Sequence, residues 1–371
     1  MIHFTKGTVA WRLVEVISVC GEYPYRSLCI LGNERELRTR VKQMSEPQKY
    51  RFENADRDVE CCAFTLSGKG KMKNIRLRKE ALPLLREIGT EEQYLRRFPP
   101  GSFRGDYSHI DRTHRNAEII AMFYMAGVTV TDDDETLLAG AGQSIFMLAK
   151  GVKADGADSI NKTGFTRLSG VFYCDGLKYA VYNTRDRAMR WDGGGEQKIC
   201  EQLHADARYN FGGAIVFCRD LQTGFKVFRQ EHIKNSALRL NGIYYFCWFF
   251  TFDPTGITSL RMFSVPDWYR RIRAKVFGNS SGAGWEFGHG TEFYDVFDGE
   301  TCWLLFADGD FRRLQEIKDR SKYHKAAVVG VGSHTDFLQE LLKDTGIQIY
   351  HIPENRFEKL VSDIARNHCS F

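Results

Sequence analysis

The sequence has no apolar run long enough to cross a membrane. Its most apolar stretch, residues 244–252, is much shorter than the ~20 residues that span a bilayer, so we expect one buried strand there. The first eight residues are polar, and no apolar segment of the kind found in signal peptides follows them. We therefore expect a cytoplasmic protein with no membrane partner.

The sequence also lacks the spacings that mark metal sites, disulfide frameworks and common catalytic centres. It contains ten cysteines, but none forms a Cys-x-x-Cys pair, and many lie in apolar stretches, which predicts buried free thiols in a reducing compartment. No P-loop, HExxH or His-hydrophobic-His motif occurs. We accordingly assign no metal, no cofactor and no catalytic residue.

Positive charge is concentrated in the N-terminal part of the chain. Residues 1–105 contain 20 Lys and Arg and 13 Asp and Glu, a net charge of +7, whereas the remaining residues carry −2. Lys and Arg neutralise phosphates and release their counterions, so a segment that binds nucleic acid needs such an excess. A second basic stretch, residues 268–275, either extends a DNA-binding surface or forms a solvated helix face.

The chain begins with the pattern of a helix–turn–helix. Apolar residues at helical spacing predict a first helix that starts after Thr8, and residues 25–31 form a short second helix. Asn33 followed by Glu36 is a capping-box pattern, which predicts that a third helix begins directly after Asn33 and covers residues 34–46.

This third helix has the two faces of a recognition helix. Leu37, Val41 and Met44 follow one another at helical spacing and therefore share a buried face. The residues that lie away from this face are of the types that read base edges and bind phosphates. We expect the following of them to contact DNA: Arg35, Arg38, Thr39, Lys42 and Gln43.

A hairpin with a basic tip follows the recognition helix. Residues 60–66 and 73–78 are the expected strands, residues 67–71 form the turn, and residues 80–88 pack back as a helix. We expect three lysines of this hairpin to contact the DNA backbone: Lys69, Lys71 and Lys73. A glycine–lysine hairpin after a recognition helix is typical of a wing, so residues 1–95 are predicted to form a winged helix–turn–helix domain.

Winged helices have two kinds of partner. The basic wing favours double-stranded DNA, with the recognition helix in the major groove and the wing on the backbone. The alternative is an adaptor that uses the same surface to dock another protein.

The rest of the chain has the pattern of an α/β domain. Residues 96–108 contain Pro99-Pro100 and two glycines, which predicts a linker before a domain over residues 109–371. Asp-Gly pairs at Asp175 and Asp298 predict two hairpins, and the last hundred residues alternate between strands and helices. We expect a mixed, partly parallel sheet.

Such a sheet is compatible with a degenerate restriction-endonuclease-like fold. That chemistry needs an Asp on one strand and Glu-x-Lys on the next, so that carboxylates hold Mg²⁺ and a lysine orients water. Asp175 fits the first position, but residues 179–184 contain neither a carboxylate nor a lysine. We expect no DNA cleavage; the alternative is a Mg²⁺-dependent nuclease with an atypical site around Asp175 and Glu196.

The order of these features resembles the replication–relaxation family of Gram-positive bacteria, whose members are encoded largely on plasmids and integrative conjugative elements. The resemblance lies in the winged-helix stretch over residues 34–88, especially residues 73–78, in His114-Arg115-Asn116, and in the hairpin with the segment from Trp191 to Glu196. It implies an N-terminal winged helix and a C-terminal nuclease-like fold, often without an intact active site.

Together these features predict a sequence-preferring, double-stranded DNA-binding protein of a mobile genetic element. It would act in conjugative transfer, plasmid replication or its regulation. The α/β domain would then bind other transfer or replication proteins, or a second copy of the chain.

Overall fold

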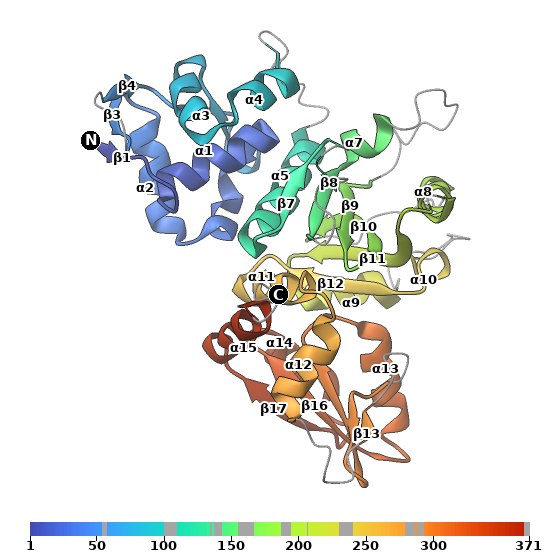
Figure 1. Ribbon diagram of the computed structural model, residues 1–371. Helices are drawn as coiled ribbons and strands as arrows, with labels where there is room; N and C mark the ends of the chain where they lie inside the picture. Colours follow the sequence, from blue (N-terminus) through green and yellow to red (C-terminus); the bar gives the residue numbers. More distant parts are fainter. Residues whose placement is uncertain are drawn as a thin grey trace. The chain divides into compact units, whose positions relative to one another are not determined.

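The structure is a computed structural model in which two compact units, Met1–Met125 and Ala126–Phe371, are distinguished (Figure 1). It describes residues 1–53, 58–99, 110–133, 136, 143–154, 167–186, 194–205, 207–229, 240–278, 286–287 and 293–366. Among the helices within these ranges, none combines the length and apolarity that a membrane crossing requires.

The first unit combines helices with two small sheets. Its elements are β1 (Ile2–His3), α1 (Val9–Cys20), β2 (Glu22–Pro24), the 3-10 helix η1 (Tyr25–Leu31), α2 (Glu34–Met44), β3 (Gln48–Arg51), β4 (Val59–Cys61), β5 (Phe64–Ser67), η2 (Gly70–Met72), β6 (Asn74–Leu77), η3 (Lys79–Ala81), α3 (Leu82–Ile88), α4 (Glu91–Arg97) and α5 (Ile110–Ala126).

Side-chain caps begin the two main helices of this unit. The Thr8 hydroxyl accepts a hydrogen bond from the Trp11 amide (3.3 Å), and Asn33 Oδ1 accepts one from the Glu36 amide (3.2 Å). Each cap satisfies an amide that would otherwise have no partner in the first turn. The predicted starts of α1 and α2 are therefore confirmed, although α2 ends at Met44, before the predicted end at residue 46.

The predicted hairpin, β5–β6, belongs to one of two small sheets in this unit. One has the strand order β2-β6-β5, and the other has the order β1-β3-β4. The expected strand over residues 60–66 is wrong: it divides between the two sheets at Cys62. The Cys62 amide donates to the Glu80 carboxylate (3.3 Å) instead of to a neighbouring strand, so the chain leaves one sheet and enters the other.

Helix α5 belongs to the first unit. Glu118 accepts a hydrogen bond from the Ser27 hydroxyl (2.6 Å), and the Tyr124 hydroxyl donates to Glu15 on α1 (2.6 Å). Both carboxylates lie where α5 packs against η1 and α1. The boundary therefore falls after Met125, whereas the sequence placed this helix in the second domain. Residues 100–108 of the expected linker lie outside the described residues, and residues 91–97 are helical.

The second unit is a mixed α/β structure. Its elements are β7 (Thr129–Thr131), β8 (Ile145–Leu148), α7 (Ala149–Ala154), β9 (Gly170–Cys174), β10 (Leu177–Arg185), α8 (Gly194–Ala205), β11 (Asn210–Cys218), α9 (Leu221–Arg229), α10 (Leu240–Ile243), β12 (Cys247–Thr251), α11 (Pro254–Phe263), α12 (Trp268–Phe277), β13 (Glu286–Phe287), β14 (Val296–Phe297), β15 (Thr301–Phe306), α13 (Phe311–Arg320), β16 (Lys325–Val331), α14 (His334–Leu342), β17 (Gln348–Ile352) and α15 (Glu354–Arg366).

The strands of this unit form two sheets with the same internal plan. The first has the order β12-β11-β10-β9-β8-β7, and the second has the order β13-β14-β15-β16-β17. In each, an antiparallel hairpin (β9–β10 or β14–β15) is followed by two strands parallel to its second arm, with helices in the connections. The unit thus contains a structural repeat whose sequence trace is little more than the two Asp-Gly turns.

The first of these turns has the backbone that its sequence predicts. Asp175 and Gly176 both have positive φ, 51° and 73°. This is the conformation of a tight hairpin turn, which Asp tolerates and Gly adopts freely.

Phenylalanines join the two sheets in one core. Phe249 on β12 lies 4.8 Å from Phe311 on α13, measured between ring centroids, and Phe225 on α9 lies 5.2 Å from the same ring. Because α13 connects β15 and β16 of the second sheet, these contacts join the two sheets of the second unit. The predicted buried thiols are confirmed here, since Cys218, Cys247 and Cys302 are buried in or beside this core.

Candidate nucleic-acid interface

Helix α2 buries one face and exposes a polar one. Leu37, Val41 and Met44 are buried against the first unit, as their spacing predicts. The five α2 residues expected to contact DNA are all exposed: Arg35, Arg38, Thr39, Lys42 and Gln43. Arg35, Thr39 and Gln43 also line a shallow hollow with Asn33, Glu36 and Arg40.

Two of these side chains already have partners on the helix. Arg38 Nη2 lies 2.5 Å from Glu34 Oε1 in an i, i+4 ion pair, with both side chains about half exposed (48% and 43%). The Thr39 hydroxyl donates to the Arg35 carbonyl (2.9 Å), so its oxygen can still accept a hydrogen bond. An exposed ion pair of this kind contributes little to stability, so a stronger anion can displace Glu34 from Arg38.

The hairpin presents its lysines through glycines at its tip. Gly68 has a φ of 74°, and a Cβ atom there would lie 2.4 Å from the Met72 carbonyl oxygen. Only glycine fits this position without displacing the backbone. The tight turn leaves Lys69 and Lys71 exposed, while Lys73 is half-buried at the start of the returning arm.

Tyr25 lies where the helix and the hairpin meet. Its amide donates to the Lys73 carbonyl (2.9 Å), which fixes the residue beside the hairpin. The Lys73 ammonium lies 4.1 Å from the centroid of the Tyr25 ring, and the Arg38 guanidinium carbon lies 5.3 Å from it. Both distances are within the range of cation–π attraction. The structure therefore brings Arg38 of α2 and Lys73 of the hairpin to one ring.

A buried carboxylate fixes the base of the hairpin. Glu22 on β2 accepts hydrogen bonds from Arg76 Nε (2.8 Å) and from Asn74 Nδ2 (3.1 Å), both on β6. His114, buried on α5, places its Nε2 3.8 Å from the same carboxylate. Asn74 Oδ1 also accepts a hydrogen bond from the hydroxyl of Ser67 on β5, the opposite arm of the hairpin. These contacts tie β2, β5 and β6 together beneath Tyr25, so the hairpin is held at several points.

Tyr25 and Glu22 are the residues that the sequence did not reveal. Tyr25 was assigned only to the short second helix, and Glu22 is a single acidic residue between apolar ones. Each acquires its role from strand pairing between β2 and β6, which are distant in the chain. No spacing pattern carries that information.

The two residues of the alternative nuclease site, Asp175 and Glu196, differ in their surroundings. Asp175 is exposed in the turn that precedes β10, where its carboxylate accepts a hydrogen bond from the Asp267 amide (2.9 Å). Glu196 is buried on α8, after the other end of that strand, and its carbonyl accepts from Tyr244. A nine-residue strand of about 30 Å separates the two segments along the chain.

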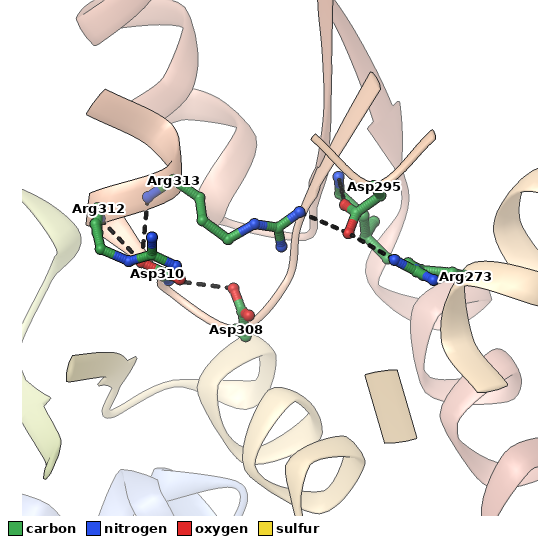
Figure 2. A network of polar contacts seen from close by, with 7 residues as sticks. Arg273, Asp295, Asp308, Asp310, Arg312 and Arg313 are labelled. Atoms are coloured by element: carbon green, nitrogen blue, oxygen red, sulfur yellow. Dashed lines mark hydrogen bonds and ion pairs between the residues drawn. The ribbon is translucent and has the colours of Figure 1, made fainter. Parts of the chain in front are cut away.

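The carboxylates that do gather in the second unit are paired with arginines (Figure 2). Asp295 lies 2.7 Å from Arg313 Nη2 and accepts the Leu305 amide (2.5 Å). Arg273 lies on the other side of Asp295, at 4.0 Å. Asp310 caps α13 by accepting the amide of Arg313 (3.2 Å), and Asp308 accepts the Asp310 amide (3.1 Å). Each of these acidic groups is buried.

Burial dominates the protonation of this network. Loss of solvent, reinforced by the neighbouring Asp310, raises the pKa of Asp308 to about 7. The pKa of Asp310 is also raised by burial, against the opposing effect of Arg312 and Arg313. Arginines occupy the positions that a cation would need, and the described residues include no group of three metal-ligating side chains. The network holds β14, β15 and α13 together.

The second basic stretch is not one exposed face. Arg273 is buried in the network of Figure 2, with its guanidinium carbon 4.3 Å from the Tyr269 ring centroid. Arg271 donates to the Ile364 carbonyl (3.4 Å). Only Arg270 and Lys275 of the four cations are exposed, so α12 uses its charge mainly for internal contacts.

No protein-family model, no curated protein and no solved structure matches the chain.

Proposed function

We propose that the first unit is a winged helix–turn–helix and that the protein is a sequence-preferring, double-stranded DNA-binding protein. The order of α1, β2, η1, α2 and the β5–β6 hairpin, with the sheet order β2-β6-β5, supports this assignment. In this proposal α2 enters the major groove, which is wide enough for a helix, and the hairpin lies along the backbone.

One observation carries the proposal: Arg38 of α2 and Lys73 of the hairpin converge on the Tyr25 ring. A duplex presents a groove and its flanking phosphates on the same side, so a protein that uses both elements must direct their cations to a common side. The exposed polar residues of α2 and the lysines of the hairpin tip supply the remaining contacts.

For the second unit we propose a nuclease-like fold that does not cleave DNA and that binds transfer or replication proteins, or a second copy of the chain. The run β8–β9–β10–α8–β11, with three antiparallel strands followed by a parallel one, supports a restriction-endonuclease-like plan. The separation of Asp175 from Glu196 supports the absence of catalysis. With the resemblance to the replication–relaxation family, this favours a role in conjugative transfer or plasmid replication.

The test compares charge removal at the hairpin tip with charge removal elsewhere. The full chain is titrated against fluorescent duplex DNA, as wild type, as Lys69→Ala/Lys71→Ala, and as Lys322→Ala/Lys359→Ala. The last variant loses the same charge at exposed sites of the second unit. We expect the tip variant to bind roughly tenfold more weakly at low salt and the control to bind like wild type. Folded wild-type protein that leaves duplex DNA unbound would refute the proposal and favour the adaptor.

A further inference from the structure

We infer that Arg38, Lys73 and Tyr25 form a clamp for one backbone phosphate, so that Arg38 positions the protein on DNA and does not read a base. The inference rests on the proposed DNA binding. It refines the expectation from the sequence, in which Arg38 contacts DNA without a distinction between base edges and phosphates.

The clamp is built from three elements. Tyr25 opens η1 directly after β2, Arg38 lies in the middle of α2, and Lys73 begins the returning arm of the hairpin. The two cations lie 5.3 Å and 4.1 Å from the same ring centroid. The hydrogen bond from the Tyr25 amide to the Lys73 carbonyl fixes the ring relative to the hairpin. The arrangement therefore exists before any ligand arrives.

Two cations at one ring favour an anion that can reach both. Arg38 and Lys73 carry like charges and repel each other, and Glu34 forms an ion pair with Arg38. A phosphodiester that contacts both cations would remove the repulsion and replace Glu34. Arginine suits this role because its planar group can stack on the ring and still donate to phosphate oxygens. The charges of the site therefore suit a phosphate and not the edge of a base.

The clamp leaves other α2 residues to read the sequence. Gln43 is exposed on the hollow formed by Asn33, Arg35, Glu36, Thr39 and Arg40, away from the contacts that engage Arg38. A glutamine amide can donate to and accept from the major-groove edge of adenine. We therefore assign phosphate binding to Arg38 and Lys73, and base reading to the part of α2 that includes Gln43.

Selection from random DNA separates the two roles without knowledge of the target site. Full-length wild type, Arg38→Ala, Tyr25→Phe, Tyr25→Leu and Gln43→Ala are each used to select duplexes from one pool with a randomised core. The enriched sequences and the affinity for the unselected pool are then measured. Circular dichroism verifies that each variant is folded, and Lys322→Ala serves as the charge-matched control for Arg38→Ala.

We expect Arg38→Ala to enrich the same sequences as wild type while binding every duplex about five- to tenfold more weakly, with a salt slope shallower by about one. Tyr25→Leu should weaken binding in the same uniform way, and Tyr25→Phe should not. Gln43→Ala should change the enriched sequence. Altered sequence preference in Arg38→Ala, or wild-type affinity in Tyr25→Leu, would overturn the clamp while leaving DNA binding intact. Failure of wild type to bind the pool would instead refute the proposed function.

Discussion

Neutralising Glu34 should strengthen DNA binding. Its carboxylate lies 2.5 Å from Arg38 Nη2, so an approaching phosphate must both displace it and tolerate its charge. At about 5 Å in a solvent-like dielectric, repulsion between two unit charges is roughly 1 kcal/mol, which corresponds to about a fivefold change in affinity. Glu34→Gln removes that repulsion and frees Arg38. The loss of the ion pair and of a favourable charge at the helix start should cost only about 0.5–1 kcal/mol of stability.

Glu36→Gln provides the matched control. Glu36 is also exposed in the first turn of α2, and its replacement changes the net charge equally. Both variants are compared with wild type by fluorescence anisotropy on the same duplex, at several salt concentrations. We expect Glu34→Gln to bind more tightly than Glu36→Gln, because only Glu34 is paired with Arg38. Equal affinities for the two variants, or weaker binding by Glu34→Gln, would refute this reasoning about the clamp.

Three further predictions follow from buried or strained groups. Because burial raises the pKa of Asp308 from about 3.8 to about 7, the folded state keeps a proton that the unfolded state releases, and the stability that this proton provides is lost as pH rises from about 4 to above 7. In urea titrations, the free energy of unfolding of Asp308→Asn relative to wild type should therefore rise by roughly 1–3 kcal/mol between pH 5 and 8, and a constant difference would contradict the assignment. Asp295→Asn should lower the free energy of unfolding by about 3–5 kcal/mol because Arg313 loses its buried partner, whereas Glu300→Gln, at an exposed ion pair, should leave it unchanged. Similar midpoints of urea unfolding for the two variants would count against a structural role for the network. Gly68→Ala should weaken DNA binding more than Gly70→Ala, since both glycines have positive φ but only the first would bring a Cβ against the backbone, and identical binding curves would show that the hairpin tip is not a contact.

Local signals made helix α2 and most of the second unit predictable. The Asn33 cap and the spacing of Leu37, Val41 and Met44 located α2 because a helix depends on residues three and four apart. The Asp175-Gly176 pair located its hairpin for the same reason, since the turn conformation depends on those two residues. The exposed DNA-contact candidates of α2 followed directly from this helical geometry.

Long-range pairing made the rest unpredictable. The strand expected over residues 60–66 divides at Cys62 because its two ends pair with strands from different parts of the chain. Helix α5 packs with the first unit through Glu118 and Tyr124, beyond a segment whose composition indicated a linker. The position of the Tyr25 ring beside the hairpin depends on the pairing of β2 with β6. None of these contacts leaves a periodic signal in the sequence.

The salt dependence of DNA binding tests the central claim most directly. Each phosphate contact contributes a slope of about −0.9 to the plot of log affinity against log salt. The full chain should therefore bind duplex DNA with a steep negative slope. A variant with alanine at Arg38, Lys69, Lys71 and Lys73 should show a slope shallower by about 3–4. Equal slopes for wild type and this variant, with both folded, would contradict the account.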